Sequence, residues 1–289
     1  MDDTADVLPK LLRKEGASHM KIRLVELFAG IGAFTAAFRN LKIPHETVAI
    51  AEIDPHAIRA YTSIHGEVPN LGDISLVENL PECDLLTYSF PCQDISLAGR
   101  GRGFSKSDDA EDQTRSGLLW EVERLLLKAE RKPKYLIMEN VDAILNTPHI
   151  RNFKLWMRAL TEMGYTSSYA VLDASDYGVP QSRRRCFMVS ALGDERFVFP
   201  SPAPDGRILA DVLEDKVDDK YFLPSKRLEN LEIRKLPPKT EGLILRADLN
   251  EKFDTTSRVY SSAGLSPCLR ARGDKNVAVE SLSVRTATA

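Results

Sequence analysis

Two segments of the sequence end apolar runs with side chains that can do chemistry. Phe90-Pro91-Cys92-Gln93 follows a strand-like run over 84–89, and Met138-Glu139-Asn140-Val141 follows the apolar run 135–137. A cysteine after a rigid proline and before a Gly/Arg/Ser-rich loop is positioned like a nucleophile. If both runs are parallel strands, thiol and carboxylate meet at one sheet edge. Either segment alone also fits a small buried cysteine or a structural carboxylate.

A glycine turn near the start of the sequence indicates a nucleoside site. In Phe28-Ala29-Gly30-Ile31-Gly32, glycines stand between a strand-like and a helix-like segment, where backbone amides can approach a ligand. Thr35 stands where a third glycine would complete a dinucleotide fingerprint. Glu52, about 20 residues later, can accept from both ribose hydroxyls, and Asp73 from an adenine amino group. The pattern favours S-adenosylmethionine over NAD; an NAD oxidoreductase and a turn without a ligand are the alternatives.

The elements that position these residues alternate along the chain. Strand-like segments cover 23–27, 47–53, 84–89, 135–138, 167–173 and 185–191, and helix-like segments cover 33–40, 55–65, 118–131 and 152–163. Alternating strands and helices predict an α/β fold, a doubly wound and mainly parallel Rossmann-like sheet.

The chain divides into segments of different composition. Residues 1–19 read as a tag or disordered leader before Met20, and 20–198 as the cofactor-binding catalytic domain. Residues 199–206 hold three prolines and a glycine, which predicts a hinge. The irregular pattern over 207–289 predicts a smaller second domain.

Composition bounds the partners. With 43% hydrophobic and 28% charged residues and no apolar run of membrane length, the sequence predicts a cytoplasmic globular protein. The four cysteines lie far apart, and their spacing predicts neither a zinc site nor a disulfide framework. The net charge of -3 argues against indiscriminate nucleic-acid coating. Lysine and arginine nevertheless cluster around 100–106, 183–185 and 270–275, and a local basic cleft competes with a solvated surface as the explanation.

Taken together, the ordered motifs resemble those of the DNA cytosine-5 methyltransferases. The resemblance spans about Arg23 to Ala191 and rests on Phe28-Ala29-Gly30-Ile31-Gly32, Glu52-Ile53-Asp54, Gly72-Asp73-Ile74, Pro91-Cys92-Gln93, Glu139-Asn140-Val141 and Gln181-Ser182-Arg183-Arg184-Arg185. A weaker similarity, to a segment of the family's target-recognition domain, covers Arg258-Val259-Tyr260 and 264–267. The family's fold and its role in DNA methylation and restriction-modification are therefore expected here, and residues 207–289 become a target-recognition domain.

The resemblance implies a mechanism and roles for the residues. Cys92 would add to C6 of a cytosine flipped out of duplex DNA, which makes C5 able to accept the methyl group. Glu139 would contact N3 and N4 of the base, and Arg183 and Arg185, alternating on a strand, would hold O2 or orient Glu139. We expect the cofactor to contact Phe28, Gly30, Gly32, Glu52, Ile53, Asp73 and Pro91. We expect DNA to contact Gln93, Ser96, Arg100, Arg102, Arg258, Arg270 and Arg272.

Two departures from the family pattern set alternatives. Ile53 stands where many members have an aromatic residue on the adenine, so that contact would be dispersion and not stacking. No Gly-Asn-Ser/Ala closing motif follows Val284-Arg285. The sequence therefore also leaves open a split or inactive subunit that needs a complementary polypeptide to close the cofactor site. A tRNA cytosine-5 methyltransferase of the same fold is the remaining alternative.

Overall fold

The computed structural model describes residues 21–91, 118–147, 149–216, 218, 242–248, 258–268 and 278–280. The chain forms two compact units, Met1–Val171 with Arg185–Ser201 and Leu172–Arg184 with Pro202–Ala289. One division falls within the segment 199–206 predicted as a hinge, and the segment Leu172–Arg184 groups with the second unit. The functional meaning given to the two domains stays a prediction.

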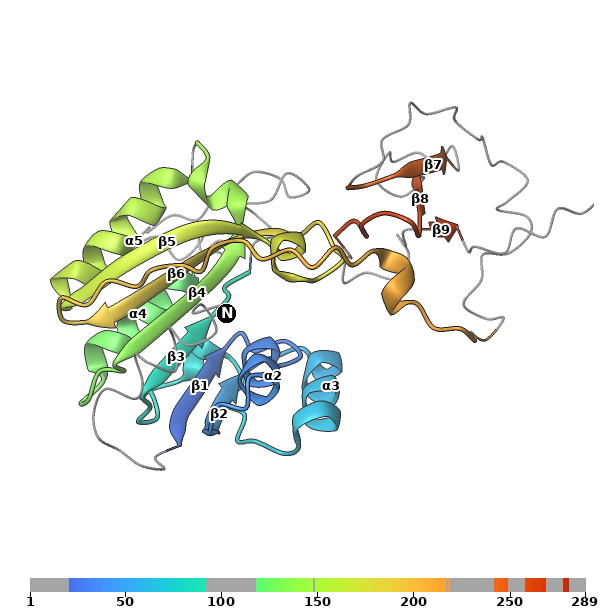
Figure 1. The fold of residues 1–289 in the computed structure, drawn as a ribbon. Coiled ribbons are helices and arrows are strands. Elements are labelled where there is room, and N and C mark those ends of the chain that lie inside the picture. Colours follow the sequence, from blue (N-terminus) through green and yellow to red (C-terminus); the bar gives the residue numbers. More distant parts are fainter. Residues whose placement is uncertain are drawn as a thin grey trace, which may run out of the picture. The chain divides into compact units, whose positions relative to one another are not determined.

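A six-stranded sheet with the order β2-β1-β3-β4-β6-β5 carries the first unit (Figure 1). Its strands are β1 (Ile22–Leu27), β2 (His45–Ala51), β3 (Leu85–Tyr88), β4 (Tyr135–Val141), β5 (Tyr165–Asp173) and β6 (Arg184–Leu192). β1 pairs in parallel with β2 and β3, and β3 with β4, whereas β6 runs antiparallel to β4. The predicted α/β class with a mainly parallel sheet is confirmed.

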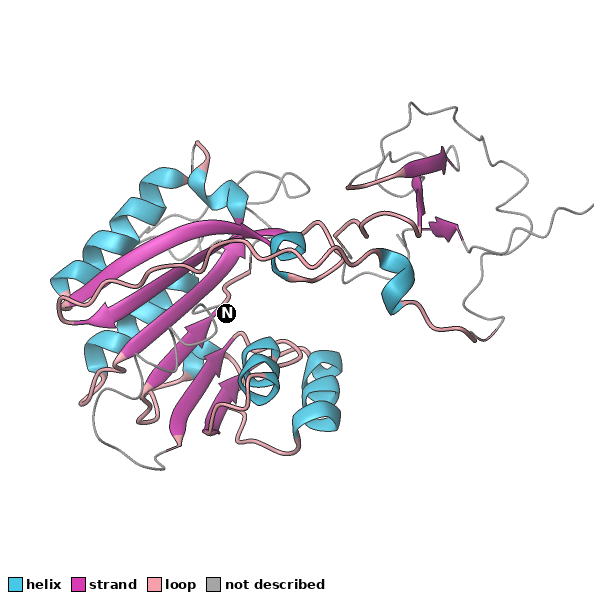
Figure 2. Ribbon diagram, viewed as in Figure 1, coloured by secondary structure: helices cyan, strands magenta, loops and turns pink. Residues whose placement is uncertain are grey.

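Among the described residues, the helices that cover the sheet are α2 (Ala33–Asn40), α3 (Pro55–His65), α4 (Leu119–Lys128) and α5 (Ile150–Glu162) (Figure 2). Local signals set their ends. α3 begins where the Asp54 carboxylate accepts the His56 amide at 2.7 Å and Pro55 takes the first helical position, and it ends at Gly66 with φ 88°. The bounds of α2 and α3 are those predicted from the sequence.

The two faces of the sheet bury different helices. Val25 and Leu27 of β1 pack in a cluster with the apolar faces of α4 and α5, whereas Leu24 of the same strand packs in a separate cluster with Phe38 of α2. Successive side chains of a strand point to opposite faces, so helices lie on both sides of the sheet. This is the doubly wound arrangement, in which sites form at the carboxyl ends of the strands.

Two strands end two or more residues away from the predicted position. β2 ends at Ala51 and not at Ile53, so Glu52 is the first residue beyond the strand. β4 was predicted to stop at Met138 because polar residues follow, but it continues to Val141. The antiparallel neighbour β6 pairs with this extension, Glu139 opposite Phe187 and Asn140 opposite Cys186, and so holds polar residues in the strand.

The second unit contains a three-stranded sheet with the order β7-β8-β9. Its strands are β7 (Leu245–Asp248), β8 (Arg258–Ser261) and β9 (Ala278–Glu280). Within this unit a bridge pairs Gln181 with Ser266, and the Ser182 amide donates to the Ser266 carbonyl at 2.8 Å. The arginine-rich motif and the segment resembling the family's recognition domain are therefore in direct contact. None of the helices described is long and apolar enough to span a bilayer.

Candidate functional site

A cavity of about 220 Å³ opens at the carboxyl ends of the strands in the first unit. Its walls come from the glycine turn after β1, the end of β2, the turn before the short 3-10 helix η2 (Ile74–Leu76), and the end of β3. The lining residues are Phe28, Ala51, Glu52, Ile53, Gly72, Asp73, Ile74, Ser89, Pro91 and Leu118. Five of the seven residues predicted for cofactor contact, Phe28, Glu52, Ile53, Asp73 and Pro91, thus share one cavity.

The glycine turn over residues 28–32 has backbone angles that glycine adopts more readily than other residues. Phe28, Gly30 and Gly32 all have positive φ, at 57°, 55° and 79°. A side chain on Gly32 would place its Cβ 2.5 Å from Tyr61 and 2.6 Å from His65, so this glycine is needed for both conformation and space. Gly30 has open space where a Cβ would lie. The turn therefore packs tightly on α3 at Gly32, whereas at Gly30 it is open.

Glu52 is held by backbone amides rather than by a charged partner. Its Oε2 accepts the Gly30 amide at 2.8 Å, and its Oε1 accepts the Ile53 and Asp54 amides at 2.9 Å each. A carboxylate offers about four acceptor positions. About one remains for a ligand in this conformation, so the predicted ribose contact is to one hydroxyl unless the side chain turns.

Asp73 and Ile53 form the remaining polar and apolar walls. The Asp73 carboxylate accepts the Ser75 amide at 2.9 Å and the Ser75 hydroxyl at 2.8 Å, which fixes the turn before η2. Ile53 is 69% exposed although it is large and apolar. An exposed aliphatic side chain on a cavity rim is suited to a flat apolar ligand surface.

The sequence analysis did not single out Glu26, which lies beneath this turn. Glu26 is 1% exposed in the middle of β1, and its Oε1 accepts the Thr35 amide at 3.1 Å as well as the Thr35 hydroxyl. Burial raises the pKa of the Glu26 carboxyl, and the hydrogen bonds from Thr35 and Tyr61 oppose that rise. The available signal was an acid inside the apolar run Leu24-Val25-Glu26-Leu27.

A second set of polar groups lies at the neighbouring end of β4. Arg185 Nε lies 3.0 Å from Glu139 Oε1, with only 18% and 22% of the two side chains exposed. Asn140 is buried, and its Nδ2 donates to the Phe90 carbonyl at 3.1 Å while its Oδ1 accepts the Val141 amide at 2.9 Å. The extended β4 therefore ties the pair Glu139–Arg185 to the backbone that leads into Pro91.

Arg183 and Arg184 differ from Arg185 in their surroundings. β6 begins at Arg184, so the strand alternation used to place Arg183 beside Arg185 does not reach Arg183. Arg183 belongs to the second unit, where its Nη1 donates to Cys268 Sγ at 3.2 Å. Arg184 is exposed, as its expected outward direction requires.

Most of the remaining predicted site residues lie outside the residues that the structure describes. The nucleophile candidate Cys92 lies outside the described residues, as do Gln93, Ser96, Arg100, Arg102, Arg270 and Arg272. Arg258 begins β8, and only its backbone is described. Their roles stay predictions.

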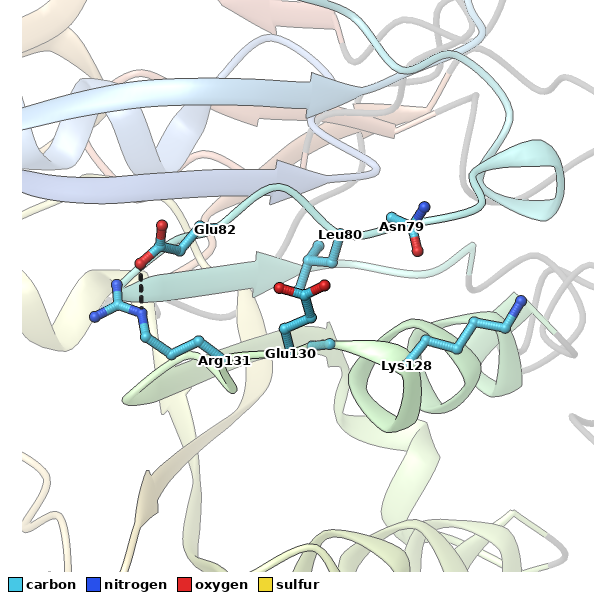
Figure 3. Close-up of a pocket in the computed structure, with 7 residues that line it drawn as sticks. Asn79, Leu80, Glu82, Lys128, Glu130 and Arg131 are labelled. Atoms are coloured by element: carbon cyan, nitrogen blue, oxygen red, sulfur yellow. Dashed lines mark ion pairs between the residues drawn. The ribbon is translucent and has the colours of Figure 1, made fainter.

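A larger cavity of about 480 Å³ lies at the opposite edge of the sheet, before β3 and after α4 (Figure 3). It is lined by Asn79, Leu80, Glu82, Lys128, Ala129, Glu130 and Arg131. Arg131 pairs with Glu82 at 2.8 Å and with Asp84 at 3.0 Å. These are exposed ion pairs at the amino ends of the strands, away from the edge where α/β folds bind ligands. The smaller cavity is therefore the candidate site.

The fold and the site together define a Rossmann-like methyltransferase. A sequence profile of the C-5 cytosine-specific DNA methylases matches residues 22–288. The chain is 31% identical over 265 residues to the type II methyltransferase M2.ScrFI of Lactococcus lactis subsp. cremoris, covering 72% of each protein. It is 33% identical over 223 residues to the type II methyltransferase M.NlaX of Neisseria lactamica, covering 76% of this chain and 68% of that protein.

The solved structures show the same fold. The chain superposes on the Dnmt2 methyltransferase of S. pombe with a TM-score of 0.63 and 19% identity, covering 89% of this chain and 74% of that one. On the methyltransferase EhMeth of Entamoeba histolytica the TM-score is 0.57 at 18% identity, with 72% and 64% covered. The protein belongs to the C-5 cytosine-specific DNA methylase family and is a DNA cytosine-5 methyltransferase by class.

Proposed function

We propose that this protein transfers a methyl group from S-adenosylmethionine to C5 of a cytosine flipped out of duplex DNA, through a covalent bond between Cys92 and C6. Family membership supports the reaction class. The observation that carries the proposal is the placement of Glu139, paired with Arg185 on the adjoining strand, beside the backbone that leads into Pro91 and Cys92.

The residues of the cavity fit the nucleoside half of this cofactor. Glu52 offers its remaining acceptor position to a ribose hydroxyl, and Ile53 and Phe28 offer apolar surface to a purine. The cavity volume of about 220 Å³ is below the range of roughly 300–1,000 Å³ typical of complete ligand sites. It therefore suits part of the ligand. When bound, S-adenosylmethionine supplies an electrophilic methyl group.

At the base, the residues of this chain carry the proton and electron steps. The Cys92 thiolate adds its electron pair to C6, which moves electron density to C5 and makes it nucleophilic. Glu139 shares a proton with N3 and accepts from the N4 amino group as charge develops on the ring. Arg185 orients Glu139 through their ion pair. After transfer, a water molecule takes the C5 proton, the electron pair of the C5–H bond re-forms the C5–C6 double bond, and the Cys92 sulfur leaves C6 as a thiolate.

DNA is proposed as the substrate because the matching profile is that of DNA methylases and the relatives are named type II methyltransferases. The contact between Gln181–Ser182 and Ser266 adds a structural reason, since it joins the base-binding motif to the segment that resembles a target-recognition domain.

The test is transfer of tritium from methyl-labelled S-adenosylmethionine to unmethylated duplex DNA, with tRNA and single-stranded DNA as parallel substrates. Bisulfite sequencing of the DNA product then locates the modified base. We expect label in duplex DNA at C5 of cytosine within a short recurrent sequence. Label in tRNA alone would contradict the proposed substrate, and label on adenine would contradict the base chemistry.

A further inference from the structure

The amino end of α2 is capped from inside the protein. Gly32, the residue before the helix, has no side chain to accept the free amides of the first turn. Glu26 takes that role from the preceding strand, because its Oε1 accepts the Thr35 amide at 3.1 Å. An acceptor that normally comes from the cap residue thus reaches the helix from beneath.

A polar network fixes this buried carboxyl group. The Thr35 hydroxyl donates to Glu26 Oε1, and the Tyr61 hydroxyl lies 3.5 Å from the same oxygen. Among the residues the structure describes, Glu26 Oε2 and the Thr87 hydroxyl are buried without a hydrogen-bond partner. The parallel register places Thr87 of β3 directly beside Glu26. A carboxyl this well enclosed costs free energy to bury, so its position calls for a functional reason.

The same turn holds a second carboxylate. The Gly30 amide donates to Glu52 Oε2 at 2.8 Å, and there is open space where a Cβ on Gly30 would lie. In dinucleotide-binding folds, amides of the glycine turn and of the first helical turn hold the pyrophosphate. Here two such amides, those of Gly30 and Thr35, already donate to protein carboxyl groups.

We propose that Glu26 is a specificity-determining residue that excludes phosphate-bearing nucleotides from the cofactor site. It occupies an amide that a phosphate would use and adds a second acidic group behind the turn. A nucleoside whose substituent carries positive charge meets no such conflict. This inference rests on the proposed function, because it assumes that the cavity at Glu52 binds an adenine nucleoside.

The experiment measures how well unlabelled adenosine and adenosine 5′-monophosphate displace tritiated S-adenosylmethionine from the full chain. The quantity of interest is the ratio of the two inhibition constants. Glu26→Gln keeps an acceptor for Thr35 and offers an amide donor to Thr87 while it removes the charge. Glu26→Met removes the acceptor as well, at similar volume. Glu46→Gln, an exposed acid at the start of β2, is the matched control.

We expect wild type and Glu46→Gln to bind adenosine better than the monophosphate. We expect Glu26→Gln to shift the ratio about tenfold toward the monophosphate, the size of a favourable charge effect at a helix end. A shift in both Glu26 variants assigns the exclusion to charge, and a shift in Glu26→Met alone assigns it to the occupied amide.

An unchanged ratio in Glu26→Gln and Glu26→Met would overturn the inference. If Glu26→Met does not fold, Glu26→Ala, which also frees the Thr35 amide, takes its place, and an unchanged ratio in Glu26→Ala and Glu26→Gln would overturn the inference. Failure of the proposed function gives a different result, since wild type would then bind neither S-adenosylmethionine nor adenosine.

Discussion

Acidic side chains near the carboxyl ends of β1 and β2, called the first edge, are held differently from the acidic side chain Glu139 near the carboxyl end of β4, called the second edge. The Glu52 carboxylate accepts the Gly30 amide and the amides of the two residues that follow it, and Asp54 and Asp73 accept amides two residues ahead. Glu139 instead pairs with the side chain of Arg185 on another strand. Backbone amides hold a carboxylate at a fixed place because they cannot move without the backbone, whereas a guanidinium can move with its side chain. The first edge is therefore suited to binding a part of a ligand that does not react, and the second to a base whose charge changes during the reaction.

The largest expected effect is on the proposed nucleophile. Cys92→Ser should lower methyl transfer by about 10³-fold or more, since a serine hydroxyl is a far weaker nucleophile than a thiolate at neutral pH. S-adenosylmethionine affinity should change little, because the thiol acts on the base. Single-turnover transfer to duplex DNA and calorimetry with the cofactor measure the two quantities. Appreciable turnover by the serine variant would show that the nucleophile is another residue.

Glu139→Gln should come next, with kcat lowered about 10²–10⁴-fold, the usual contribution of a positioned acid or base. Arg185→Lys should lose less, because an ammonium keeps the charge but not the fixed geometry of the guanidinium. The double variant should lose less than the sum of the two losses in free energy, since the residues act as one pair. Additive losses in kcat would mean that the ion pair does not serve catalysis.

A smaller effect is expected at the first edge. Glu52→Gln keeps one oxygen acceptor but places an amide donor beside the Gly30 amide or those of Ile53 and Asp54. Leaving amides and a ribose hydroxyl unpaired costs about 1–3 kcal/mol per group, so S-adenosylmethionine should bind about 10–100-fold more weakly. Affinity for duplex DNA should stay at the wild-type value. Unchanged cofactor affinity by calorimetry would refute the assignment of the cavity.

The contrast between the two edges also explains which features of the fold and the site could be predicted from the sequence. Glycines, Asp54-Pro55 and Gly66 are local signals, so the predicted bounds of α2 and α3 are the observed ones. Five of the residues predicted for cofactor contact line one cavity. The extension of β4 to Val141 depends on pairing with β6, more than 40 residues away, and the tie from Asn140 to Phe90 is of the same long-range kind. Glu26 escaped notice because its partners Thr35 and Tyr61 come together only when α2 and α3 pack on β1. Polar residues within apolar runs are the places where sequence periodicity gives the least information about partners.

The smallest expected effect concerns Asp173, another carboxylate that accepts backbone amides. Burial alone would raise the pKa of Asp173, but hydrogen bonds from the Ser175 and Arg183 amides bring it below its ordinary value. A depressed pKa means that the folded state is favoured above the unfolded-state pKa, near 4, and that this contribution is lost as the pH falls through the folded-state pKa. At pH 7, Asp173→Asn should therefore be less stable than wild type by about 1 kcal/mol, and it should unfold at a lower temperature. The gap between the two proteins should narrow as the pH is lowered below about 4, because protonation of Asp173 removes the charge that the amides stabilise. Thermal unfolding followed by circular dichroism at pH 7 and at a series of lower pH values measures the gap, and a gap that does not change with pH would show that the Asp173 carboxylate contributes through its shape and not its charge.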